Sequence, residues 1–114
     1  MQYMLLIHSE EGAFERLPND VVVNAMAEYG AYTEALRKAS VLVNSNRLRP
    51  SSMSSTVRYE NDKVRVKDGP FAETKEQIGG YYLIDVADLD AALKWASKCP
   101  GARHGSVEIR PVWG

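Results

Sequence analysis

The chain has 114 residues, the length of one domain, and its composition of 45% apolar and 25% charged residues predicts a folded core rather than disorder. Its net charge of -1 gives no basic patch to attract nucleic acid or an anionic membrane, so we expect neither as a partner. A single cysteine and the absence of any early apolar run longer than residues 4–7 indicate one cytoplasmic domain over residues 1–114.

The first half of the chain predicts two strands separated by a long helix. Residues 2–8 contain no breaker and are apolar on both faces, as in a buried strand. Pro18 suits the first turn of a helix that reaches residue 39, and apolar residues recur every three or four positions across Gly30. We therefore expect one helix rather than two. A second strand begins at residues 41–43, and residues 49–56 form a polar loop.

An inserted β-hairpin is expected between residues 57 and 67. Apolar residues alternate there with charged ones on both sides of Asn61-Asp62, which favours a tight turn between two strands. The alternation predicts that one face of the hairpin is exposed to water. Its apolar members are Val57, Tyr59, Val64 and Val66.

The last part of the chain predicts a strand, a helix and a final strand. Gly79-Gly80 precedes a strand over residues 81–86 and suggests a bulge at its start. Asp88 suits the N-cap of a helix that stops at residues 100–101. Residues 106–113 form the last strand. The stripe expected to be buried on this helix comprises Leu89, Ala92, Leu93 and Ala96.

Without the hairpin, the order is β-α-β-β-α-β, which predicts an α+β, ferredoxin-like fold. Two helices cover one face of a four-stranded sheet, yet the strands at residues 2–8 and 81–86 are apolar on both faces. An open apolar face of this size would aggregate, so a second copy is the simplest cover. We therefore expect a homodimer whose sheets pack face to face.

Four segments of the chain resemble the DGPF branch of the YCII-related family: "DGPFAETKEQIGGYYLIDV" from Asp68, "YMLLIH", "LDAALKWASKCP" and "VEIRPVW". The resemblance covers nearly the whole chain and implies a dimeric α+β barrel. It also implies two alternative roles. One is a small-molecule enzyme that acts on aromatic or lactone-like compounds, and the other is a non-catalytic regulatory partner of an alternative sigma factor. Enzymes that resemble this chain use a histidine on the first helix with an aspartate; here that helix has no histidine, and Glu28 stands near the place.

Asp68 is the leading candidate for chemistry. A carboxylate held in a turn beside Pro70 and Phe71 would act as a general acid or base if it were partly desolvated. The alternative is a turn residue that accepts hydrogen bonds from backbone N–H groups. Glu73, Lys75 and Glu76 follow in a charged run that is typical of a solvated surface.

Three further polar residues are candidates. His8 ends the first strand and is either a second proton group or a hydrogen-bonded residue at the rim of the sheet. Glu108 and Arg110 share one face of the last strand, where Arg110 would bind an anionic ligand or pair with an acid such as Glu28. His104 lies in a glycine-flanked loop and is expected to be exposed.

We therefore expect a small organic ligand in a cleft near Asp68, with Asp68, His8 and Glu28 as proton groups and Arg110 as the anion-binding group. The side chains expected to contact the ligand are Phe71, Tyr81, Tyr82, Glu108 and Arg110. Two distant histidines and one cysteine match no zinc spacing, so neither a metal nor another cofactor is expected.

Overall fold

Strands and helices follow one another in the predicted order. The computed structural model describes residues 1–72 and 74–114, so Glu73 lies outside the described residues. The elements are β1 (Gln2–Glu10), α1 (Asn19–Lys38), β2 (Leu42–Arg47), η1 (Ser51–Met53), β3 (Ser55–Glu60), β4 (Lys63–Asp68), β5 (Glu76–Asp85), α2 (Leu89–Lys98), α3 (Gly101–His104) and β6 (Ser106–Pro111).

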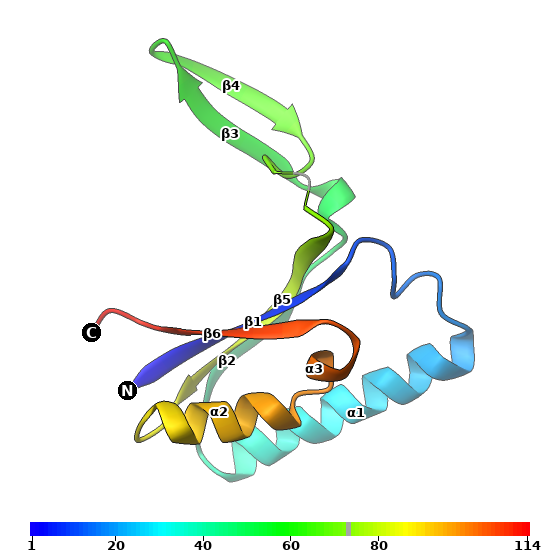
Figure 1. Ribbon diagram of the computed structural model, residues 1–114, viewed down its shortest axis with the longest axis vertical. Coiled ribbons are helices and arrows are strands. Elements are labelled where there is room, and N and C mark those ends of the chain that lie inside the picture. The colour runs from blue at the N-terminus through cyan, green and yellow to red at the C-terminus, as the bar shows by residue number, and fades with distance from the viewer. Residues whose placement is uncertain (73) are drawn as a thin grey trace.

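The main sheet has four strands in the order β2-β5-β1-β6, and every neighbouring pair is antiparallel. Figure 1 shows α1 and α2 on the same face of this sheet. The chain order, the strand order and the single helical layer are those of a ferredoxin-like α+β fold, which confirms the predicted fold class.

The hydrophobic core lies between the sheet and the helices. Alternate residues of β1 (Tyr3, Leu5 and Ile7) point into it, as predicted from the two-residue period of a strand. Tyr32 of α1 meets the ring of Tyr82 edge to face at 5.2 Å, an arrangement worth about 0.5–1.5 kcal/mol beyond burial alone. Its hydroxyl also donates to the carbonyl of Trp95 at 2.7 Å, so this residue links α1 with β5 and α2.

Helix α1 runs unbroken across Gly30, as expected, but only its second half is packed into the core. Tyr32 and Leu36 are its buried residues, whereas Met26 in the first half is 40% exposed. Pro18 is the cap residue before the helix rather than part of its first turn. The predicted apolar stripe is therefore buried in the second half of the helix and partly exposed in the first half.

Helix α2 begins where predicted, because the side chain of Asp88 accepts a hydrogen bond from the N–H of Ala91 at 2.9 Å. Of the stripe expected to be buried, Ala92 and Ala96 are buried, but Leu89 and Leu93 are 48% and 46% exposed. The prediction was wrong for both leucines. The segment expected to be a glycine-flanked loop is also different, since it contains the short helix α3, on which His104 is exposed.

Strand β5 begins at Glu76, earlier than the sequence predicted, and both glycines lie inside it. Ile7 of β1 faces Gly80 while His8 faces Ile78, so Gly79 is an extra residue and forms the predicted bulge. At Gly80, a Cβ atom would lie 3.0 Å from the carbonyl oxygen of Asn46, which explains why a glycine suits this close strand pair.

The β3–β4 hairpin forms a separate two-stranded sheet that projects from the rest of the molecule (Figure 1). Its turn residues, Asn61 and Asp62, have φ of 51° and 61°, as a tight primed turn requires. The sequence predicted that one hairpin face would be wet, but both faces are exposed. Its apolar residues Val57, Tyr59, Val64 and Val66 are between 53% and 73% exposed.

The face of the main sheet opposite α1 and α2 carries no helix, and we call it the open face (Figure 1). Met4, Leu6, Tyr81 and Leu83 lie on it, since their strand neighbours point into the core. In residues 1–72 and 74–114, no helix has both the length and the apolar character that crossing a membrane demands.

Candidate functional site

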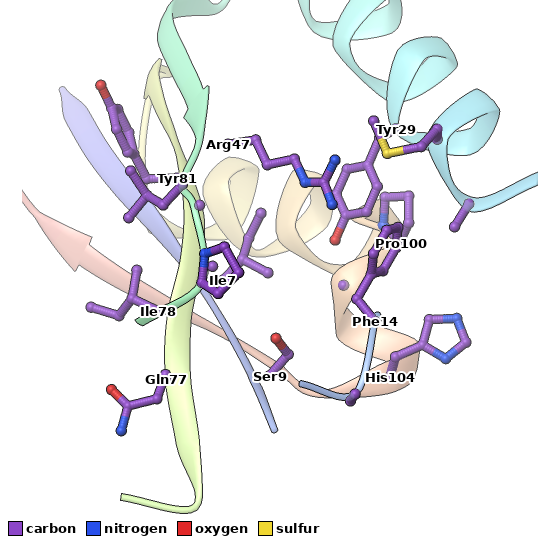
Figure 2. A pocket seen from close by; sticks show the side chains of 18 of the residues that line it. Ile7, Ser9, Phe14, Tyr29, Arg47, Gln77, Ile78, Tyr81, Pro100 and His104 are labelled. Atoms are coloured by element: carbon purple, nitrogen blue, oxygen red, sulfur yellow. The ribbon is translucent and has the colours of Figure 1, made fainter. Parts of the chain in front are cut away.

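A cavity of about 680 Å³ lies between the first half of α1 and the sheet. The loop of residues 11–18, the end of β2 and the first half of β5 complete its wall. Figure 2 shows Ile7 and Ser9 of β1 on one side and Tyr29 of α1 on the other. This volume lies within the range of about 300–1,000 Å³ found for sites that bind small molecules.

Glycine and alanine residues contribute to several parts of the cavity wall, where they leave room that larger side chains would fill. The buried residues of α1, Tyr32 and Leu36, lie in its second half, whereas the cavity lies beside its first half. The small residues on the wall are Gly12, Ala13, Ala25, Gly30, Gly79, Gly80 and Gly101.

Two aromatic residues and an arginine define the most distinctive part of the wall. The guanidinium carbon of Arg47, at the end of β2, lies 4.7 Å from the centre of the Phe14 ring, a cation–π contact. Figure 2 shows Arg47 reaching across from β2 towards Tyr29 on α1. Among the ion pairs of the described residues, none involves Arg47. The site therefore combines aromatic surface with a positive charge that lacks a carboxylate partner.

The hydroxyl of Tyr29 is held in its protonated form. Burial raises the pKa of this phenol, and Cys99 and Tyr82 act in the same direction, while the charge of Arg47 opposes them more weakly. A phenol with a raised pKa is a hydrogen-bond donor throughout the physiological range. A Cβ atom on Gly101 would lie 2.7 Å from this hydroxyl, so the glycine leaves the room that the phenol occupies.

Three of the predicted site residues line this cavity: Glu28, Tyr81 and Tyr82. The Glu28 carboxylate lies 3.8 Å from Arg103, and its side chain is about half exposed. The Tyr82 hydroxyl is 2.8 Å from Oγ1 of Thr33, which ties it to α1. Tyr81 points away from the cavity in Figure 2, and its hydroxyl accepts hydrogen bonds from Asn44 and Asn46 on the open face.

Asp68 and Phe71 lie at the base of the hairpin and are not among the residues that line the cavity. Asp68 ends β4 opposite Ser55 and is exposed, and within the described part of the chain its carboxylate accepts no hydrogen bond. The turn itself is real: Gly69 has φ of 93°, and its N–H donates to the carbonyl of Ser54 at 2.7 Å. Phe71 is 57% exposed, with the Arg58 guanidinium 4.0 Å from its ring centre.

His8, Glu108 and Arg110 form a cluster of their own on the open face. His8 Nε2 lies 3.2 Å from Glu108 Oε1, and Arg110 forms an ion pair with the other carboxylate oxygen. The hydrogen bond from Arg110 is the main reason that the pKa of Glu108 is lowered, and His8 adds to the effect. Arg110 thus pairs with an acid of its own strand. The suggested pair with Glu28 is wrong within one chain, because that residue lies on the helical side of the sheet.

Sequence reasoning missed Phe14, Tyr29 and Arg47 as site residues. Tyr29 was assigned to the apolar stripe of the helix, and the other two lie outside any recognisable motif. The only signal available was the concentration of small residues around residues 12–13, 79–80 and 101, which predicts missing side-chain volume. In the described residues, no three histidine, cysteine, aspartate or glutamate side chains gather to hold a metal ion.

Comparison with known proteins places the chain in a family. The YCII-related domain matches residues 1–114. An uncharacterised protein of Rhizobium meliloti (strain 1021) is 36% identical over 114 residues, covering 98% of this chain and 92% of its own. A solved structure, 5-chloro-2-hydroxyhydroquinone dehydrochlorinase (TftG) from Burkholderia phenoliruptrix AC1100 in complex with 2,5-dihydroxybenzoquinone, has the same fold. Its TM-score is 0.57 and its identity 13%, over 100% of this chain and 94% of that one. The chain therefore belongs to the YCII-related family.

Proposed function

We propose that this protein binds a small organic molecule in the cavity between α1 and the sheet. The observation that carries the proposal is a cavity of about 680 Å³ whose lining includes Phe14, Tyr29 and Arg47. A mostly apolar pocket with a few convergent polar groups is the usual form of a ligand site.

The structural neighbour is consistent with this proposal. TftG shares the fold and was solved with 2,5-dihydroxybenzoquinone, a single small ring. A ligand of that size is smaller than the cavity described above. The likeness supports a small cyclic ligand.

The geometry supports binding more directly than catalysis. Of the three residues expected to exchange protons, only Glu28 lines the cavity, while His8 is on the open face and Asp68 is at the base of the hairpin. Acid–base chemistry without a cofactor would therefore use Glu28 or other proton groups of the cavity wall, such as His104, rather than Asp68 or His8. We expect Asp68→Asn to leave ligand affinity within about twofold of wild type, since surface changes away from a site have small effects. If calorimetry showed a loss of affinity greater than twofold, Asp68 would be part of the binding site.

A fragment screen followed by two-dimensional NMR of the ¹⁵N-labelled protein tests the proposal. We expect ligands to shift the amide signals of residues around the cavity, including Ile7, Tyr29 and Gly79. Ala25→Phe should abolish these shifts, because Ala25 lines the cavity and a phenyl ring would occupy it. Ala27→Phe is the matched control, since Ala27 is exposed on the same helix and does not line the cavity.

Two results would contradict the proposal. One is a screen in which no fragment shifts the cavity residues at millimolar concentration. The other is a ligand whose shifts survive in a folded Ala25→Phe protein, because its site would then lie elsewhere.

The open face supports a further part of the proposal, that two copies pack through it. Met4, Leu6 and Leu83 form an apolar centre there that no helix covers. In a homodimer with sheets face to face, each copy would cover the other. The α1 cavities lie on the outer, helical side of each sheet and would stay open in such an assembly.

A second candidate function is protein binding through the hairpin, and its exposure is the observation that favours it. Hairpins of two strands are marginally stable alone, and the apolar side of this one faces solvent. The family resemblance makes an alternative sigma factor the partner to test. Co-purification of the wild-type protein with that sigma factor, and its loss in a Tyr59→Ser, Val64→Ser double variant, would support this function. If the double variant recovered as much sigma factor as wild type does, the hairpin would not be the binding surface.

A further inference from the structure

We infer that Arg47 anchors a negatively charged group, so that the cavity takes a planar organic acid. This inference rests on the proposed function, because it assumes that the cavity binds a small molecule. It goes beyond it by naming the charge of the ligand and the residue that recognises it.

The distribution of ion pairs among the arginines carries the argument. The chain has eight arginines. Six of them form ion pairs with carboxylates, and none of these six lines the cavity: Arg16, Arg37, Arg58, Arg65, Arg103 and Arg110. The remaining two, Arg47 and Arg49, line the cavity and have no carboxylate partner among the described residues. Among the described residues, the guanidinium groups without a carboxylate partner are thus concentrated at one site.

In the part of the chain that the structure describes, no carboxylate around the cavity forms an ion pair with Arg47 or Arg49. Glu10 lies 3.9 Å from Arg16, Glu11 accepts a hydrogen bond from Ser51, and Glu28 lies 3.8 Å from Arg103. Glu15, the fourth acid on the wall, is exposed on the loop of residues 11–18. Glu10 and Glu28 are therefore paired with arginines outside the cavity, whereas Glu11 is bonded only to a neutral hydroxyl of the wall. None of the four forms an ion pair with Arg47 among the described residues, so its planar fork is available for a ligand carboxylate.

The neighbours of Arg47 indicate a planar ligand. Its guanidinium group lies over the Phe14 ring, and Tyr29 faces it across the cavity (Figure 2). Flat rings stack well on such surfaces. Within the described residues the Tyr29 hydroxyl donates no hydrogen bond, so it remains available as a second donor to an acidic oxygen. Arginine and phenol together would bind the oxygens of a carboxylate or an acidic enol.

A pair of probes that differ only in charge tests the inference: 2-naphthoate and 2-naphthamide, titrated by calorimetry into the full-length protein. We expect wild type to bind the carboxylate about tenfold more tightly than the amide, since hydrogen bonds to charged groups are roughly twice as strong as neutral ones. Arg47→Gln should remove this preference. Arg65→Gln, a hairpin arginine outside the cavity, is the matched control and should retain it.

The possible results separate the inference from the proposed function. If wild type binds both probes equally, or if folded Arg47→Gln keeps the preference, Arg47 is not the anchor, although the cavity still binds ligands. If neither probe nor any screened fragment binds, the proposed function fails and the inference fails with it. Should Arg47→Gln not fold, salt dependence in wild type decides: naphthoate affinity should fall with added salt and naphthamide affinity should not.

Discussion

Gly101 is the residue whose replacement most directly tests the shape of the cavity. A Cβ atom there would lie 2.7 Å from the Tyr29 hydroxyl and 2.8 Å from Cγ2 of Ile7. We expect Gly101→Ala to lower the free energy of unfolding by about 1–3 kcal/mol, the usual cost of overpacking, and to weaken ligand binding. Urea denaturation measures the first effect and calorimetry the second.

Gly30→Ala is the matched control for this prediction. Gly30 also lines the cavity, but a Cβ atom there would meet nothing within 4 Å, and the residue lies inside α1. Alanine is the better helix former, so the variant should be more stable by about 0.5–1 kcal/mol. If both variants lowered the free energy of unfolding equally, the space around each glycine would not explain the effect on stability.

At Glu108, an arginine and a histidine contact one carboxylate, and the stability of the protein should depend on the ionisation of that carboxylate. The Arg110 hydrogen bond and then His8 lower the pKa of this group below its ordinary value of 4.5 in the folded state. A carboxylate with a lowered pKa stabilises the fold above its unfolded-state pKa. That contribution disappears as pH falls through the folded-state value.

Glu108→Gln should therefore be less stable than wild type near neutral pH, with the difference shrinking below about pH 4.5. Because the carboxylate is exposed to solvent, we expect the difference to be small and to shrink in high salt as well. Urea denaturation at several pH values measures it. A difference that stays constant from neutral to acidic pH would show that the carboxylate charge plays no part.

The hairpin is the element whose stability depends most on its turn. Asn61 and Asp62 both adopt positive φ, which glycine tolerates better than aspartate at the second position. We expect Asp62→Gly to slow hydrogen exchange of the β3 amides about two- to fivefold, while Asp62→Ala speeds it up. Because the hairpin is a separate sheet, global unfolding should change little in either variant. Equal exchange rates in all three proteins would mean that the turn does not limit hairpin opening.

Elements whose signal is local could be predicted from the sequence. The alternation in β1, the 3–4 spacing in α1 and the N-cap at Asp88 each depend on neighbours a few residues away, and each is present in the structure. The early start of β5 and the short helix α3 depend instead on pairing and packing with distant segments. A sequence pattern does not describe those partners.

At the scale of the whole molecule, the candidate site also depends on contacts between distant segments, which a local sequence pattern does not describe. The resemblance drew attention to Asp68, but the cavity arises from the way α1 leaves the sheet. The loop of residues 11–18, helix α1 and the end of β2 bring Phe14, Tyr29 and Arg47 together. No spacing in the sequence relates these residues, so only the composition of small residues on the wall hinted at the space between them.

The open face exposes apolar side chains of the main sheet, and this exposure leads to a prediction about assembly. Leu6 occupies the centre of this face, between Tyr81 on one neighbouring strand and Glu108 on the other. Water contact along such an apolar centre is unfavourable by about 25 cal/mol per Å². Size-exclusion chromatography with light scattering at micromolar concentration should therefore give twice the mass of one chain.

Leu6→Lys should shift the protein to a monomer, because pairing two copies through this face would bury one added ammonium group from each copy. Leu93→Lys is the matched control: this leucine lies on α2, is 46% exposed, and faces away from the open side of the sheet. A lysine there should leave the dimer intact. If wild type is monomeric, or if both variants remain dimeric, the two copies do not meet through the open face. A monomeric Leu6→Lys protein that still binds the naphthoate probe would show that each α1 cavity is complete within one chain.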